Sequence, residues 1–317
     1  MTKYTLQILL FVFCCLTCGD ATAQRVARYR GNKAAAISYT FDDGLLEHYT
    51  VLRQKLSEHA FPATFAVIGS EVGGDHKGTP IMTWSQLREL RDDGHELSSH
   101  GYEHRNVTKL SAEELRHELQ ANDTLIYDSA GVWPRTFVYP GNRRSEETVR
   151  ICEEGRVGSR TALMSLGGKT AGKGEQWLRR WVDSLIVRGE WAVTMTHGIS
   201  YGYDHFADPG VLWRHFDYVD SLRSQLWIGT FADISAYVKE RDALRLHVER
   251  RKNGTIEITP SLSLDRRLFS VSLTLVLPVT EKVRAVQDGR ELPVERQGDC
   301  QLLDFNPHGG KIVVSRR

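Results

Sequence analysis

The sequence is poor in cysteine and proline and carries almost no net charge. Five cysteines and nine prolines occur in 317 residues, which excludes a disulfide framework and a collagen-like chain. Lysine and arginine number 41 against 40 aspartate and glutamate residues, so no global field attracts nucleic acid or an acidic membrane. Hydrophobic residues make up 41% and charged residues 26% of the chain. This balance is typical of an ordinary globular protein.

The sequence also lacks an apolar run long enough to span a membrane. A short apolar run lies near its start. Lys3 precedes an apolar run over Leu6–Leu16, whereas a bilayer-spanning helix needs about 20 residues. With the small residues at Ala21–Ala23, the pattern predicts a secretory signal over residues 1–23, cleaved near Ala23, and export to the periplasm or outside. An uncleaved anchor and lipidation at Cys18 are the alternatives. Cleavage leaves two cysteines, Cys152 and Cys300.

Apolar strand patterns and helical patterns alternate between residues 34 and 241. Strands are expected over 34–41, 63–68, 95–99, 136–139, 192–196 and 226–231. Helices are expected over 45–59, 84–91, 111–127, 146–154, 177–187, 211–222 and 234–241. This alternation indicates a parallel α/β fold, either a barrel or a doubly wound sheet. In such folds the chemistry lies at the carboxyl ends of the strands.

The pattern changes after Arg241. Apolar and polar residues alternate over 244–249 and 269–277, and turn signals occur at Asn253-Gly254 and Asp288-Gly289. Such alternation predicts antiparallel strands. We therefore expect a signal at 1–23, a β/α domain at 24–243 and a small β-sandwich-like domain at 244–317.

Three polar clusters each follow a predicted strand. Asp42 and Asp43 are adjacent carboxylates that need partners, because neighbouring negative charges repel, although Asp-Asp-Gly is also a common turn. His100 and His104 share one face, and thus a metal, if the backbone between them is helical. Two histidines and one carboxylate make an open catalytic metal site. His197 follows another apolar strand and is a candidate general acid.

These clusters resemble the motifs of the NodB-type polysaccharide deacetylases, carbohydrate esterase family four. The resemblance rests on Thr40–Gly44 and on Gly94–Leu97 leading into His100-x-x-x-His104, and it covers about residues 30–240. It implies a distorted (β/α) barrel and metal-dependent removal of acetyl groups from sugars. The region after residue 244 lies outside it.

The resemblance also implies a role for each matching residue. Asp42 would be the general base that takes a proton from metal-activated water, and His197 would be the general acid. A divalent metal, usually zinc in this family, would be held by Asp43, His100 and His104. The backbone N–H of Gly141, in the third motif, would help to hold the oxyanion.

The sequence departs from the family pattern at three places, of which the mildest is Met195, where a leucine is usual. Val138 stands where the family has an arginine that pairs with the base, and Asn142, Arg143 and Arg144 are the candidates to replace it. The motif that tunes the family's histidine acid has only one weak counterpart, at Arg180–Asp183.

Substrate signals come from two loops. Aromatic side chains stack on sugar faces, so Tyr201 and Tyr203, which follow His197, are predicted to contact substrate. Asp75 and His76 lie in a Gly-rich loop over Glu71–Pro80; they could bind metal, but a solvated loop is the simpler interpretation.

Together these patterns predict an exported metal-dependent deacetylase of an N-acetylated amino-sugar polysaccharide. The alternatives are an O-acetyl esterase, a hydrolase of non-sugar amides on the same scaffold, and a carbohydrate-binding surface protein that has lost catalysis. We expect an acetylated glycan as substrate, no nucleic-acid partner and no transmembrane segment in the mature chain. The oligomeric state is left open.

Overall fold

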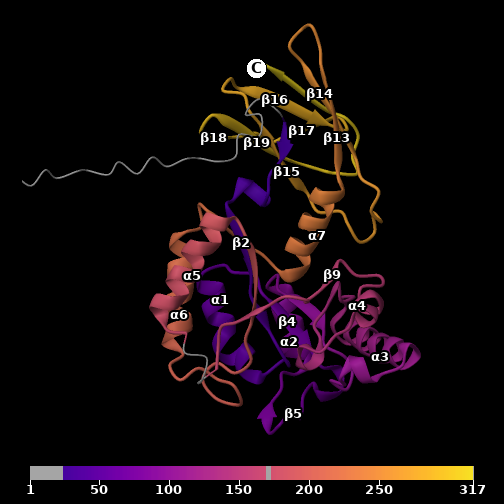
Figure 1. Ribbon diagram of the computed structural model, residues 1–317, viewed down its shortest axis with the longest axis vertical. Coiled ribbons are helices and arrows are strands. Elements are labelled where there is room, and N and C mark those ends of the chain that lie inside the picture. Colours follow the sequence, from indigo (N-terminus) through magenta and orange to yellow (C-terminus); the bar gives the residue numbers. More distant parts are fainter. Residues whose placement is uncertain (1–23, 169–172, 317) are drawn as a thin grey trace, which may run out of the picture.

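A computed structural model describes residues 24–168 and 173–316 (Figure 1). The expected signal, its cleavage site and Cys18 lie outside these residues. Across the described ranges, every helix is too short or too polar to cross a bilayer.

A curled parallel half-barrel forms the larger lobe. The hydrogen-bonded orders are β10-β11-β2-β12 and β3-β4-β7-β8-β9. β2 and β3 are two halves of one strand path interrupted at Tyr39, and a bridge between Phe41 and Thr196 joins the two sheets. The strands are β2 (Ala35–Ser38), β3 (Thr40–Phe41), β4 (Thr64–Val67), β7 (Glu96–Ser99), β8 (Thr136–Phe137), β9 (Gly158–Ser159), β10 (Met164–Ser165), β11 (Trp191–Met195) and β12 (Leu226–Ile228). The predicted distorted barrel is confirmed.

Amphipathic helices cover the outside of this half-barrel. They are α1 (Arg53–Glu58, preceded by a π-helical turn at His48–Leu52), α2 (Trp84–Asp92), α3 (Ala112–Ala130), α4 (Glu146–Cys152), α5 (Glu175–Arg188), α6 (Gly210–Ser221) and α7 (Phe231–Ala243). Their apolar stripes pack on the strands because both faces of a parallel sheet must be covered. The capping box of Ser111 and Glu114 opens α3 as its sequence predicts.

Two antiparallel sheets form the smaller lobe, which confirms the expected C-terminal β-structure. Their orders are β1-β15-β19-β18 and β13-β14-β20-β16-β17. The strands are β1 (Arg25–Val26), β13 (Arg245–Arg250), β14 (Ile256–Ser261), β15 (Leu273–Leu277), β16 (Val283–Gln287), β17 (Arg290–Leu292), β18 (Glu295–Gln297), β19 (Cys300–Phe305) and β20 (Ile312–Arg316). Side chains of both sheets share one apolar core, which includes Ile258, Leu275 and Phe305.

The two lobes are tied together by chain segments that cross between them. β1 pairs with β15, so the first described residues belong to the antiparallel lobe. Tyr237 of α7 is fully buried in the core of that lobe, and its hydroxyl donates to the carbonyl of Ala27 at 3.0 Å. A domain division at residue 243 stays a prediction. Cys152 and Cys300 are both free thiols.

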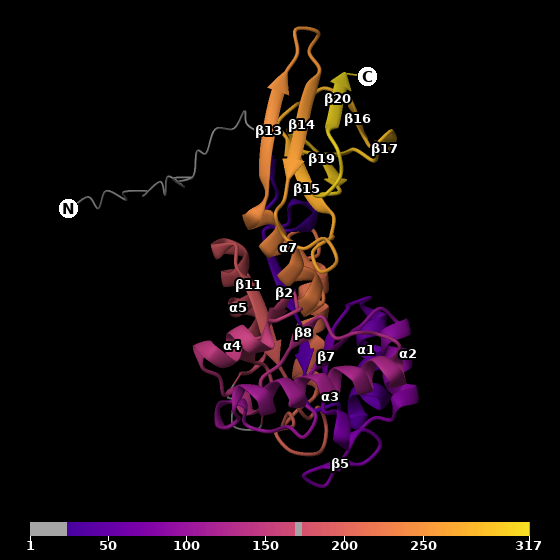
Figure 2. The ribbon, with the colours of Figure 1, turned by 90° about the vertical axis from the view of Figure 1, so that its right-hand side faces the viewer.

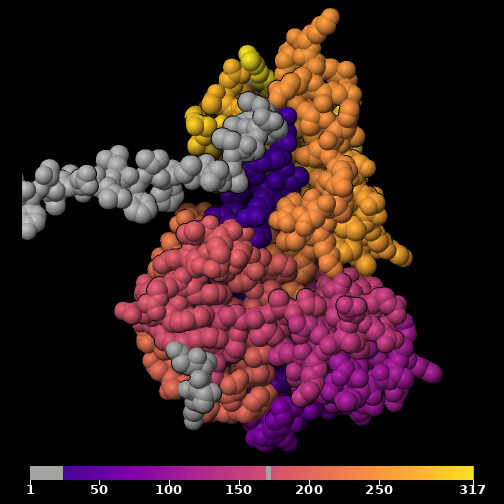
Figure 3. Space-filling model, viewed as in Figure 1, coloured from indigo at the N-terminus to yellow at the C-terminus, as the bar shows by residue number. Residues whose placement is uncertain are grey.

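The polar clusters lie at the end of the half-barrel that faces away from the antiparallel lobe. β2 runs from the junction of the lobes toward the hairpin of β5 (Asp75–His76) and β6 (Thr79–Pro80), which lies at the far end (Figures 1 and 2). The space-filling view shows the same two lobes, with the antiparallel one in orange to yellow (Figure 3). The antiparallel lobe therefore does not cover the end at which the clusters meet.

Candidate active site

Asp42 and Asp43 occupy the turn that follows β3. The backbone N–H of Asp42 donates to the carbonyl of Thr196 at 2.9 Å, which fixes the turn against the end of β11. Asp43 and Gly44 both have left-handed backbones, with φ of 71° and 72°. The turn sends the two carboxylates, each 2% exposed, to different partners: Asp42 to an arginine and Asp43 to histidines.

His100 and His104 come together through a turn after β7. The backbone between them is not helical, because Gly101 has φ of 80° and His104 has φ of 53°. A Cβ on Gly101 would lie 3.1 Å from Oε1 of Glu118, and this same oxygen accepts from the backbone N–H of Glu103 at 2.7 Å. The turn brings the two imidazole rings to 4.8 Å between centroids.

Asp43, His100 and His104 gather three metal-ligating atoms within 4.8 Å of one another. Oδ1 of Asp43 lies 3.2 Å from Nε2 of His100 and 3.6 Å from Nε2 of His104. His100 donates from Nδ1 to the carbonyl of Val138 at 2.8 Å, which leaves its Nε2 free to ligate. Oδ1 of Asp43 is buried with no hydrogen-bond partner among the described residues. These residues fit a divalent cation with three protein ligands.

The ionisation of two of the three groups suits this purpose. For His100, burial lowers the pKa, but the contact and charge of Asp43 outweigh burial and raise the pKa above its ordinary value. Burial raises the pKa of Asp43, but the close contact and charge of His100, and the charges of His197 and His104, bring the pKa well below its usual range. Burial, helped by the neighbouring His100, lowers the pKa of His104 to about 4. The site therefore offers an ionised carboxylate and a neutral imidazole, the forms that bind metal.

Arg160 supplies the arginine that the sequence seemed to lack. It follows β9 and is 1% exposed, and its guanidinium bonds both oxygens of Asp42, at 2.6 and 2.5 Å. The candidates from the third motif do not do this. Asn142 accepts from Arg160 at 3.2 Å, Arg144 donates to the carbonyls of Asn142 and Thr161, and Arg143 is exposed.

The Arg160 pair sets the state of Asp42. Burial raises the pKa of this carboxyl, but the charge and hydrogen bonds of Arg160 outweigh burial and hold the pKa below its ordinary value. Asp42 is therefore an ionised carboxylate in a fixed orientation, as a general base must be.

His197 lies just after β11 and faces the same carboxylate cluster. Its Nε2 is 3.8 Å from Oδ2 of Asp43, and its Nδ1 is 3.0 Å from Oδ2 of Asp204. The carboxylate beside the histidine is thus Asp204 from the following loop. The weak match at Arg180–Asp183 is wrong for this role, because Asp183 accepts from the hydroxyl of Tyr218 at 2.5 Å instead.

Of the remaining residues predicted to belong to the site, some lie beside His197 and others lie away from it. The Tyr203 ring lies 5.1 Å from the His197 ring, whereas Tyr201 is 40% exposed and its side chain interacts with Thr50. Gly141 has φ of 60° in the turn beside Asn142, which bonds Arg160. The expected solvated loop is wrong for His76, which is 5% exposed and packs on His104 at 5.1 Å.

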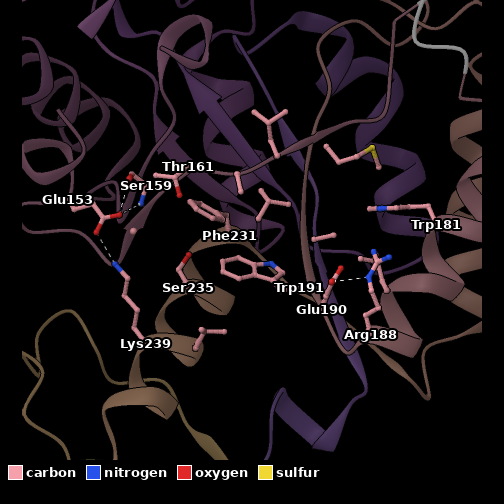
Figure 4. Close-up of a pocket in the computed structure, with 18 residues that line it drawn as sticks. Glu153, Ser159, Thr161, Trp181, Arg188, Glu190, Trp191, Phe231, Ser235 and Lys239 are labelled. Atoms are coloured by element: carbon pink, nitrogen blue, oxygen red, sulfur yellow. Dashed lines mark hydrogen bonds and ion pairs between the residues drawn. The ribbon is translucent and has the colours of Figure 1, made fainter. Parts of the chain in front are cut away.

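A separate cavity of about 430 Å³ lies near the amino end of β11, between α5 and α7 (Figure 4). Its charged side chains pair with each other, Glu153 with Lys239 at 3.0 Å and Arg188 with Glu190 at 2.9 Å. Trp191, in its wall, donates to the hydroxyl of Ser38. With these charged groups already paired, this cavity does not carry the chemistry of the strand ends.

Comparison with known sequences assigns a family to the first part of the half-barrel. Residues 30–156 match the sequence model of the family described as Polysaccharide deacetylase. This part of the chain belongs to the polysaccharide deacetylase family. The deacetylase segment contains Asp42, Asp43, His100 and His104, while Arg160 and His197 follow it in the sequence.

Individual relatives include two that are named as deacetylases and one that is named as a lyase. The peptidoglycan-N-acetylmuramic acid deacetylase of Bacillus subtilis is 27% identical over 192 residues, 59% of this chain and 62% of that protein. A peptidoglycan-N-acetylglucosamine deacetylase of Listeria monocytogenes is 29% identical over 36% of this chain and 23% of its own length. A gellan lyase of a Bacillus species is 26% identical over 90% of this chain and 13% of its own length. The chain thus spans 13% to 62% of the length of these relatives.

Solved structures include similar deacetylases. A structure of T48 deacetylase with substrate is 24% identical over 64% of this chain and 91% of that chain, with a TM-score of 0.45. The carbohydrate esterase domain of a xylanase from the hindgut metagenome of Trinervitermes trinervoides is 19% identical over 63% of this chain and 89% of that chain, with a TM-score of 0.46.

Proposed function

We propose that this protein is an exported, metal-dependent deacetylase that removes N-acetyl groups from an amino-sugar polysaccharide. The observation that carries the proposal is one group of side chains at the carboxyl ends of the strands. Asp43 forms a three-donor metal site with two histidines. Its neighbour Asp42 is bound by an arginine, and His197, which faces Asp43, is bound by Asp204. Two relatives are named as deacetylases of N-acetylated peptidoglycan sugars, and this supports an N-acetylated substrate.

Each residue has a defined task in this proposal. Asp43, His100 and His104 hold the cation, expected to be Zn²⁺. When bound, the cation supplies Lewis acidity to the acetyl carbonyl and lowers the pKa of water toward about 7.

The protein's own groups move the protons. Asp42, oriented by Arg160, accepts a proton from the water whose oxygen bonds to the acetyl carbon. His197, oriented by Asp204, donates a proton to the sugar nitrogen as the C–N bond breaks, which releases acetate and the free amine. The backbone N–H of Gly141 is proposed to stabilise the oxyanion, and Tyr203, with Tyr201 at the rim, is proposed to contact the sugar.

The arginine and carboxylate found beside Asp42 and His197 favour a catalyst over a binding protein that has lost catalysis. A carbohydrate-binding surface needs neither an oriented base nor an oriented acid. Arg160 and Asp204 provide the two pairings that are missing at the Val138 position and at Arg180–Asp183.

Acetate release tests the proposal directly. The mature protein is incubated with N-acetylglucosamine oligomers, acetylated xylan and a simple amide, with and without a chelator. We expect chelator-sensitive acetate release that is greatest with the N-acetylglucosamine oligomers. Asp42→Asn should abolish turnover while zinc content stays, and His100→Ala should lose zinc. Turnover that resists the chelator, or that survives Asp42→Asn, contradicts the proposal.

A further inference from the structure

We propose that His76, held by Glu71, is a further substrate-binding residue of this site, whose Nε2 hydrogen-bonds a polar group of the sugar near Tyr203. The inference rests on the proposed function and defines which chemical group of the substrate the site recognises. His76 belongs to the β5–β6 hairpin, outside the motifs that carry the family resemblance.

The His76 side chain is buried, and only one of its two ring nitrogens has a hydrogen-bond partner. Its Nδ1 lies 2.7 Å from Oε2 of Glu71. Because a carboxylate only accepts, Nδ1 donates to Glu71, and Nε2 is left to contact a ligand. The side chain is 6% exposed, and Nε2 has no hydrogen-bond partner among the described residues. Buried polar atoms in folded proteins almost always have a partner, so this nitrogen is suited to a ligand.

The unused nitrogen faces the proposed reaction site. Nε2 of His76 lies 3.9 Å from Oδ2 of Asp43, on the same carboxylate oxygen that His197 approaches at 3.8 Å. The Tyr203 ring lies 5.6 Å from the His76 ring and 5.1 Å from the His197 ring. The Tyr203 hydroxyl is also buried without a partner among the described residues. Two unpaired polar atoms thus belong to side chains of two loops that pack on each other, and one of them faces the carboxylate of Asp43.

The two loops are built against each other. Oδ1 of Asp75 accepts from the backbone N–H of Gly78 at 2.9 Å, which closes the hairpin. Gly202, with φ of 78°, lies so near Thr79 that a Cβ would stand 2.8 Å from its methyl group. The hairpin therefore contacts the loop that carries Tyr203, and the position of His76 is fixed by packing.

A substrate contact explains this arrangement better than a fourth metal ligand. His100 and His104 approach Oδ1 of Asp43, whereas His76 approaches Oδ2. The three-donor set is complete without His76, and a catalytic site keeps its next position open. An unpaired ring nitrogen and an unpaired hydroxyl from packed side chains select a ligand with several hydrogen-bonding groups, as a hydroxylated amino sugar has and a simple acyl ester lacks.

Kinetics of acetate release test the inference. The zinc-loaded wild type is compared with His76→Phe, Tyr203→Phe and His76→Gln on a tetramer of N-acetylglucosamine, or on acetylated xylan if that is the glycan turned over. His117→Phe, on the exposed side of α3, is the matched control. We expect the KM of His76→Phe and Tyr203→Phe to rise about tenfold with kcat within about twofold. His76→Gln keeps a hydrogen-bonding group and should recover part of the loss.

Zinc affinity, measured by competition with a chromophoric chelator, is the second readout. It should be the same in the wild type, His76→Phe and Tyr203→Phe. An unchanged KM in both apolar variants overturns the inference, and so does a loss of zinc affinity in His76→Phe, which would make the residue a ligand. Failure of the proposed function is distinct, because the wild type itself then releases no acetate from any glycan.

Discussion

At the scale of single residues, the site depends on ion pairs and hydrogen bonds that orient side chains already named by the sequence. Asp42 is held by Arg160, His100 by the carbonyl of Val138, and His197 by Asp204. Each partner restricts the side chain to one rotamer. This matters because a misplacement of a catalytic group by about 1 Å lowers the rate about 100-fold. The partners are therefore as testable as the groups they orient.

Arg160→Lys tests the orientation of Asp42. A lysine is a single point charge and cannot bond both carboxylate oxygens, so the carboxylate loses its fixed direction. We expect kcat to fall about 100-fold while bound zinc, measured by elemental analysis, stays unchanged. Arg144→Lys is the control, because Arg144 bonds only backbone carbonyls. Wild-type kcat in Arg160→Lys would show that Asp42 needs no bidentate partner.

Asp204→Asn tests the orientation of His197. The amide keeps the shape of Asp204 but removes the charge that stabilises the protonated imidazole. Because Asp204 is 41% exposed, solvent screens part of the effect, and we expect kcat to fall about tenfold with KM unchanged. Steady-state kinetics of acetate release measure both. Asp208→Asn, whose carboxylate pairs with Arg214 on the surface, is the control; an equal loss there contradicts the assignment.

At the scale of elements, one buried carboxylate organises the loop after β11. Glu47 accepts from the backbone N–H groups of Ile199, Ser200 and Tyr201, and it is fully buried. Its neighbour His48 contacts the carbonyl of His197 through Nε2 at 2.8 Å. The turn after β3 and the loop after β11 are thus one unit, although 150 residues of sequence lie between them.

Glu47→Gln tests this unit. The amide nitrogen that replaces one oxygen is a donor, so it faces N–H groups that it cannot bond, and each buried unpaired donor costs about 1–3 kcal/mol. We expect a lower melting temperature and a kcat reduced about tenfold, with zinc affinity unchanged. Calorimetry and a zinc competition assay measure these quantities. Glu58→Gln, exposed on α1, should change neither; zinc loss in Glu47→Gln would place the residue in the metal site instead.

The strength of the local pattern decided what the sequence could predict. β4 and β7 are runs of four residues beside long amphipathic helices, and both were predictable. β9 and β10 have two residues each, too few for any periodicity, so Arg160 at the end of β9 was missed. An arginine directly after a Gly-Ser pair is the only local signal. His100 and His104 were predicted together, but a left-handed turn, not a helix, joins them.

At the scale of the whole molecule, the two lobes meet at α7 across a buried acid. Glu240 is fully buried, and its Oε1 accepts from the backbone N–H of Val271 at 3.0 Å. Its Oε2 has no hydrogen-bond partner among the described residues. Burial raises the pKa of Glu240 to about 7, against the smaller opposing effects of Val271, Arg135 and Arg30. The interface is therefore sensitive to pH at a defined position.

The direction of this sensitivity follows from the two states of Glu240. Below about pH 4.5 the group is protonated in both folded and unfolded chains, and its stabilising contribution is complete. As the pH rises toward 7, the unfolded chain releases the proton while the folded chain keeps it, so the free energy of unfolding falls. Above pH 7 the group is ionised in both states and adds no further slope.

Glu240→Gln should remove this slope, because glutamine keeps an acceptor for Val271 and never ionises. We expect the variant and the wild type to differ little at pH 5, and the variant to be more stable at pH 8 by about 1–2 kcal/mol, a value reduced by solvent screening near the interface. Urea unfolding between pH 5 and 8.5 measures the difference, with Glu295→Gln on the exposed β18 as the control. Parallel pH profiles for Glu240→Gln and the wild type would mean that Glu240 is ionised in the folded protein, and that the lobes are joined without a protonated acid between them.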